Sequence, residues 1–248
     1  MDQMTKLALK EALDTIENDN YKKFAKEVGK TIPKYWYSVP ASSTGKYHPA
    51  LSLGEGGLVR HTCAVIKILN YLFGIECICG KFTSTDRDIL RIAALMHDTR
   101  KSGSQEEYES NKYTKHEHPL LAAAEVQKFV GCGIIPDESI FIIIEAIRRH
   151  MGNFCTSNHS SIVLPKPENI YEQLLHIADY LASRKELELK LVSEDGGETA
   201  DTFIMQFGKY KGMLLSEIID TDPEYLIWLR DKADMTIREP LKTLIADL

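Results

Sequence analysis

The most restrictive feature of this sequence is a succession of segments in which apolar residues recur every three or four positions. Because that spacing gathers the apolar side chains on one face of a helix, each segment predicts an amphipathic helix that must pack against others. Strand-like alternation is absent from the region they span. The expected helices cover residues 4–28, 58–73, 84–98, 118–130, 136–150 and 167–190. The sequence therefore predicts a mainly α fold, with a helical bundle over residues 1–192.

The last quarter of the chain has a different character. Residues 193–202 are acidic and contain glycine, which is typical of a linker. Residues 203–214 place two short apolar arms around Gly208 and Gly212, a pattern that favours a β-hairpin. Short helices should follow, with Pro223 in the first turn of one and Pro240 near the start of the last. Residues 203–248 are therefore expected to form a small α+β module.

Composition and charge narrow the function. The 248 residues are 44% hydrophobic and 27% charged, which excludes a disordered chain or a disulfide scaffold. No apolar run is long enough for a membrane span, and the N-terminus is too charged for a signal peptide, so we expect a cytoplasmic protein with no membrane partner. A net charge of −6 argues against binding duplex nucleic acid by bulk electrostatics. The five cysteines fit no zinc-finger spacing and are expected to be small, mostly buried hydrophobes.

Several histidine and aspartate side chains lie on helix faces that are expected to be buried. His61, for example, lies in an apolar stripe with Val65 and Ile68. A buried histidine is more often a hydrogen-bonded core residue than a ligand, but burying several with carboxylates is costly unless each finds a partner. The candidate ligands are His61, His97, Asp98, His118, His150 and Asp179. This donor set suits one or two divalent ions such as Mn²⁺, Fe²⁺, Ni²⁺, Co²⁺ or Mg²⁺.

The order of these residues resembles the signature of the HD-domain superfamily of metal-dependent phosphohydrolases. LMHDTRK is similar to that family's HD helix end, and HIADYLASR is similar to its last helix. The resemblance implies that His61, His97, Asp98 and Asp179 hold one metal, which activates water for attack on phosphorus. It also implies that His118 and His150 hold a second metal, with Asp98 bridging.

Two cations follow the candidate ligands closely. Lys101 comes three residues after Asp98 and Arg184 five after Asp179, so both are expected to bind phosphate oxygens and, with Asp98, to form the catalytic set. The alternative is that they are helix-end cations facing water. Among the other histidines, His116 is a rival to His118 because the two are close in sequence, whereas His159 and His176 are expected to be surface or packing residues.

Two narrower resemblances point to different substrates. The segment PASSTGKYHPALSLGEGGLVRHT is similar to the loop before the first metal histidine of YhaM-type 3′-to-5′ exoribonucleases, although those enzymes carry an N-terminal oligonucleotide-binding barrel where this chain has a helix. The segments HEHP and AIRRHMG resemble histidine motifs of HD-type dinucleotide polyphosphate hydrolases, which favours a small nucleotide. In either case, the loop residues expected to line the substrate entrance are Ser42, Ser43, His48 and Glu55.

The tail FGKYKGMLLSEIIDTDPEYLIWL resembles the C-terminal module of exonuclease-X-like proteins, which implies an association with nucleic acid. Lys209, Tyr210 and Lys211 are then expected to contact phosphate and base, the alternative being a solvated hairpin tip. We expect a hydrolase of nucleotide phosphoester or phosphoanhydride bonds. A 3′-to-5′ exonuclease acting on single-stranded RNA or DNA and a non-catalytic nucleotide sensor stay open, as does a homo-oligomeric state.

Overall fold

A computed structural model describes residues 1–42, 45, 48–187, 200, 203–205, 207–232 and 241–246. The chain divides into two compact units, Met1–Leu191 and Val192–Leu248. Of the expected linker at 193–202, only Ala200 falls within the described residues. The fold is mainly α-helical, as the sequence predicts.

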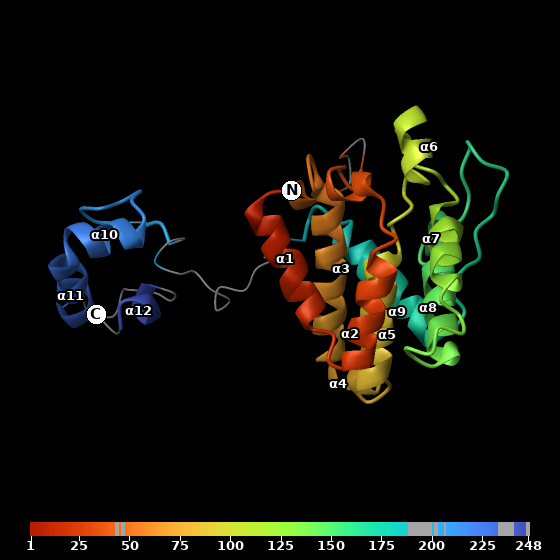
Figure 1. Cartoon of the computed structure of the whole chain (residues 1–248), viewed down its shortest axis with the longest axis horizontal. Coiled ribbons are helices and arrows are strands. Elements are labelled where there is room, and N and C mark those ends of the chain that lie inside the picture. Colours follow the sequence, from red (N-terminus) through yellow and green to blue (C-terminus); the bar gives the residue numbers. More distant parts are fainter. Residues whose placement is uncertain are drawn as a thin grey trace. The chain divides into compact units, whose positions relative to one another are not determined.

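The first unit is a helical bundle (Figure 1). Helix α3 packs against α1, α5 and α9, while α8 packs against α5, α7 and α9. Among the described residues, no helix combines the length and apolar composition that a membrane span requires. The α-helices are α1 Gln3–Asp14, α2 Asp19–Gly29, α3 Gly57–Phe73, α4 Glu76–Cys79, α5 Ser84–Met96, α6 Gln105–Ser110, α7 His118–Gln127, α8 Asp137–Arg149 and α9 Ile170–Ala182, and the 3-10 helices are η1 Lys34–Tyr37, η2 Ala50–Ser52 and η3 Gly152–Phe154.

The segment expected to be one helix over 4–28 forms two, α1 and α2, so that prediction is wrong. The carboxylate of the fully buried Asp88, on α5, accepts hydrogen bonds from the backbone N–H groups of Glu17 (3.0 Å) and Asn18 (2.9 Å). The guanidinium of Arg91 donates to the same carboxylate at 2.8 Å. Asp88 satisfies N–H groups at the start of α2. The separation of α1 from α2 therefore depends on a residue that is distant in the sequence.

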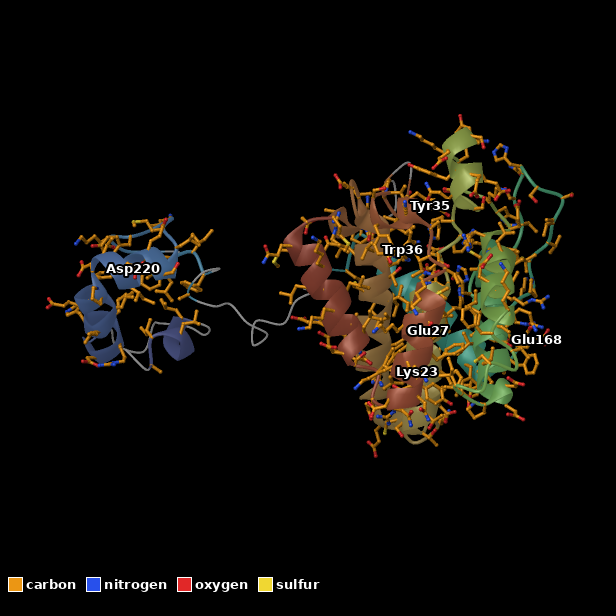
Figure 2. All side chains as sticks on the ribbon, viewed as in Figure 1. Lys23, Glu27, Tyr35, Trp36, Glu168 and Asp220 are labelled. Carbon is orange, nitrogen blue, oxygen red and sulfur yellow. The ribbon has the colours of Figure 1, made fainter. Side chains whose placement is uncertain are left out.

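Backbone hydrogen bonds connect described residues of the segment before α3, such as the one from Ala41 N–H to the Ser52 carbonyl, and the η1 residues Tyr35 and Trp36 are buried (Figure 2). At its end the chain approaches itself so closely that a Cβ on Gly57 would overlap the carbonyl oxygen of Ser52. The N–H of Leu58 donates to the carbonyl of Val39 at 2.9 Å. Glycine at this position therefore lets the loop seat against the first turn of α3, one turn before His61.

The second unit contains α10 Leu215–Thr221, α11 Pro223–Lys232 and α12 Leu241–Leu244. Pro223 occupies the first position of α11, as expected. Its core gathers Phe203, Met205, Leu215, Ile218, Leu226, Leu229, Leu241 and Ile245. Within the described residues, the expected hairpin is reduced to one antiparallel bridge between Ile204 and Leu214, because α10 begins immediately afterwards and leaves the arms too short for strands.

The cysteines depart in part from expectation. Cys63 and Cys155 are buried, but Cys77 and Cys132 are exposed and Cys79 is intermediate. The exposed pair lies on short connecting elements rather than on the apolar faces of the long helices, which explains why helical periodicity does not predict its burial.

Candidate metal centre

Three of the predicted ligand histidines are oriented by the backbone in the same way. The Nδ1 atoms of His97, His118 and His150 lie 2.7, 2.6 and 2.7 Å from the carbonyl oxygens of the residues three positions earlier. A carbonyl oxygen can only accept, so each Nδ1 carries the proton and donates it. In the neutral imidazole this leaves the lone pair on Nε2, which is the atom free to bind a metal.

Asp98 lies between two pairs of these imidazoles. Its Oδ2 lies 3.9 Å from His61 Nε2 and 3.7 Å from His97 Nε2. Its Oδ1 lies 2.9 Å from His118 Nε2 and 3.8 Å from His150 Nε2. Each oxygen of one carboxylate therefore faces a different pair of histidines, which is the arrangement a bridging carboxylate requires.

Asp179 completes the set from α9. Its Oδ1 lies 3.0 Å from His61 Nε2 and 3.7 Å from His97 Nε2. The structure thus brings together all six predicted ligands from α3, α7, α9 and the ends of α5 and α8. Among the described residues, two triplets have ligand atoms within 4.8 Å of one another: His61, His97 and Asp179, and His97, Asp98 and His150.

These atoms fit a divalent cation. His97 Nε2, His118 Nε2 and Asp98 Oδ1 are buried and make no hydrogen bond, although His118 Nε2 and Asp98 Oδ1 are only 2.9 Å apart. The short separation lacks hydrogen-bond geometry, as expected for two acceptors directed at a common point. Donors about 2.1 Å from one ion lie roughly 3.0–3.5 Å from each other, close to the separations seen here.

The charges of the site favour the same conclusion. Burial lowers the pKa of His97, and it lowers that of His150 to about 3, so both imidazoles stay neutral. Burial opposes ionisation of Asp98, but the Lys101 ammonium outweighs it and holds the pKa of Asp98 well below its usual range. For Asp179, burial is likewise outweighed, chiefly by the hydrogen bond with His61, so its pKa is also lowered. The Lys101 ammonium offsets one of these two buried negative charges, so the site still requires positive charge, which a divalent ion would supply.

All of the candidate ligands except His97 line a pocket of about 250 Å³. Both predicted phosphate-binding cations line it. Lys101 Nζ lies 2.6 Å from Asp98 Oδ2, and the Arg184 guanidinium lies 4.4 Å from the ring centroid of Tyr180. The remaining lining residues are His48, Thr114, Met151, Phe154, His176, Tyr180 and Ser183.

Of the residues predicted to line the substrate entrance, some line the pocket in the structure and others do not. His48 lines the pocket, its ring centroid 5.9 Å from that of His61, and burial lowers its pKa to about 4. Glu55 does not line the pocket: it is 73% exposed, and its carboxylate accepts from the Met1 amino group at 3.3 Å. Ser42 is also absent from the lining, its Oγ accepting from Gly45 N–H at 3.3 Å, and Ser43 lies outside the described residues. Glu55 and Ser42 are close to the site in sequence, but the loop directs them elsewhere.

Sequence reasoning missed part of the pocket wall. His176, expected to be a surface or packing residue, lines the pocket, and its Nδ1 donates to the carbonyl of His150 at 2.7 Å. It lies three positions before Asp179, so helical spacing could have placed it beside that ligand. His116 does not line the pocket, and its Nε2 contacts the Cys155 carbonyl at 3.2 Å, whereas His118 lines the pocket with its Nε2 2.9 Å from Asp98 Oδ1.

The predicted nucleic-acid contacts lie on the second unit. Lys209 Nζ is 3.1 Å from an Asp222 oxygen, and the hydroxyl of Tyr210 donates to the same carboxylate at 2.7 Å. Lys211 is exposed. Asp222 thus neutralises part of the charge on which phosphate binding by this segment would depend, and the nucleic-acid role of these residues stays a prediction.

Taken together, the fold and the six-residue cluster define a helical protein with a buried histidine–carboxylate metal site. The HD domain family model matches residues 58–184, just over half of the chain and a range that holds all six candidate ligands, so the chain belongs to the HD domain family. An exodeoxyribonuclease X-like C-terminal model matches residues 205–234. No curated protein and no solved structure matches the chain. Membership of the HD family indicates a metal-dependent phosphohydrolase.

Proposed function

We propose that the protein hydrolyses phosphoester or phosphoanhydride bonds of nucleotides at a centre that holds two divalent ions. The observation that carries this proposal is the position of Asp98, whose two oxygens face different imidazole pairs. A single ion would need only one of those oxygens. His61, His97, Asp98 and Asp179 would hold one ion, and Asp98, His118 and His150 would hold the other.

When bound, such ions lower the pKa of a water and neutralise charge on the phosphoryl oxygens. The chain's own residues do the remaining work. The backbone carbonyls fix the imidazole tautomers before any ion arrives, so little reorganisation is required. Lys101 and Arg184 supply positive charge on the pocket wall, where they can bind phosphate oxygens and orient the scissile bond.

The proposal is tested by giving the purified full chain nucleoside triphosphates, dinucleotide polyphosphates and labelled single strands with Mn²⁺, Fe²⁺, Ni²⁺, Co²⁺ or Mg²⁺, then identifying the products. His97→Ala and Asp98→Ala should abolish phosphate release and reduce the bound metal measured by elemental analysis, while circular dichroism stays helical. His159→Ala, at an exposed site outside the pocket, is the matched control. Full metal-dependent turnover by either ligand variant would contradict the proposal.

A second candidate, a 3′-to-5′ exonuclease, is favoured by the exodeoxyribonuclease X-like match over residues 205–234. The same assay separates the two: stepwise release of mononucleotides from the 3′ ends of strands, without turnover of small substrates, supports the exonuclease. Tight metal-dependent nucleotide binding without any product would instead support the non-catalytic sensor.

A further inference from the structure

The outer wall of the pocket carries two aromatic side chains that the metal chemistry does not use. Phe154 and Tyr180 line the pocket and are 53% and 41% exposed. Their rings are nearly parallel, inclined by 17°, with centroids 6.4 Å apart. Large apolar rings with this much exposed surface beside a charged pocket are available for a ligand to cover.

The position of these rings ties them to the metal centre. Phe154, in η3, follows the candidate ligand His150 by four residues, and Tyr180, in α9, directly follows Asp179. The two segments bring one ring each to the same wall. A molecule whose phosphate reaches the ligands would therefore extend its other end along Phe154 and Tyr180.

Arg184 adds a cation to this wall. Its guanidinium carbon lies 4.4 Å from the Tyr180 ring centroid, close enough for a cation–π interaction. Met151, which also lines the pocket, contributes a flexible and polarisable apolar side chain. An aromatic surface beside a guanidinium and a histidine–carboxylate metal site has the chemistry to bind a flat ring at one end of a molecule and a phosphate at the other.

We propose that Phe154 and Tyr180 form a stacking surface for the base of the substrate, and that this surface makes the site selective for nucleoside phosphates over sugar phosphates. The proposal deepens the proposed function and rests on it. Every base offers a π face, so stacking recognises a nucleotide without distinguishing which base it carries. We therefore expect similar affinities for purine and pyrimidine nucleotides.

The test is calorimetric titration of the Mn²⁺-loaded full chain with adenosine 5′-monophosphate, uridine 5′-monophosphate, ribose 5-phosphate and inorganic phosphate. The wild type should bind both nucleotides roughly 5- to 150-fold more tightly than ribose 5-phosphate, the range expected for stacking of one base. Phe154→Ala and Tyr180→Ala should each remove much of that preference. Phe154→Ala, which keeps the contact between Tyr180 and Arg184, should also leave the affinity for ribose 5-phosphate unchanged. Tyr180→Phe, which keeps the ring, should retain the preference.

Tyr71→Ala is the matched control, because Tyr71 is an exposed aromatic residue on α3 outside the pocket. Equal affinity of the wild type for adenosine 5′-monophosphate and ribose 5-phosphate, or an undiminished preference in both alanine variants, would overturn the proposal. If phosphate and ribose 5-phosphate still bind in a metal-dependent manner in that case, the phosphohydrolase proposal survives. If none of the four compounds binds, both proposals fail together.

Discussion

Replacing Asp88 with alanine removes a buried carboxylate that connects α5 to the start of α2. The carboxylate is fully buried and accepts from two backbone N–H groups and from Arg91, which is itself only 6% exposed. Arg91 keeps its contact with Asn70 Oδ1 at 2.9 Å, but its charge loses its closest counterion. Breaking one side of a buried pair of this kind costs about 3–5 kcal/mol. We expect the free energy of unfolding to fall by that amount.

The measurement is urea and thermal unfolding of Asp88→Ala followed by circular dichroism. At about 2–4 °C per kcal/mol for a unit of this size, the melting temperature should fall by roughly 6–20 °C. Glu27→Gln is the control, because Glu27 pairs with the exposed Lys30 at the end of α2, and it should change stability by less than about 0.5 kcal/mol. A loss below about 1 kcal/mol for Asp88→Ala, well short of the cost of breaking a buried pair, would refute the reasoning that Asp88 fixes the α1–α2 break.

Two further predictions concern a glycine in the pocket region and the dependence of stability on pH. In Gly152→Ala the new Cβ would overlap the His176 ring at a positive φ of 54°. We expect this variant to lose about 2 kcal/mol or more in unfolding experiments and to bind metal more weakly by calorimetry. Gly131→Ala, at φ 80° with open space around the Cβ, isolates the backbone strain. It should cost about 1 kcal/mol, and equal losses in the two variants would exclude the clash. Burial raises the pKa of Tyr35 to about 12 from an ordinary value of 10.0, so its neutral form stabilises the fold fully below pH 10. The free energy of unfolding should therefore decrease by about 2 kcal/mol as the pH rises from 10 to 12. In Tyr35→Phe, the free energy of unfolding should not show this decrease between pH 10 and 12. The same decrease in the variant as in the wild type would contradict the prediction.

The candidate ligands could be predicted from the sequence because each one violates a local pattern. His61, for example, interrupts an apolar stripe on α3, so burial follows from helical periodicity and the need for a partner follows from burial. Lys101 and Arg184 could be predicted from their short distance in sequence to Asp98 and Asp179. In the same way the long helices α3, α5, α7 and α8 begin and end close to their predicted bounds, because periodicity and capping are local properties of the chain.

Other features depend on contacts between distant segments. The break between α1 and α2 depends on Asp88, about 70 residues further along the chain. The pairing of Phe154 with Tyr180 depends on how η3 packs beside α9, and Glu55 contacts the amino group of Met1 rather than the pocket. The sequence by itself determined which faces of the long helices are buried and which residues are suited to bind a metal. Only the tertiary structure decided which of them meet around one pocket, because helical periodicity fixes the face of a helix and the packing of the bundle fixes its neighbours.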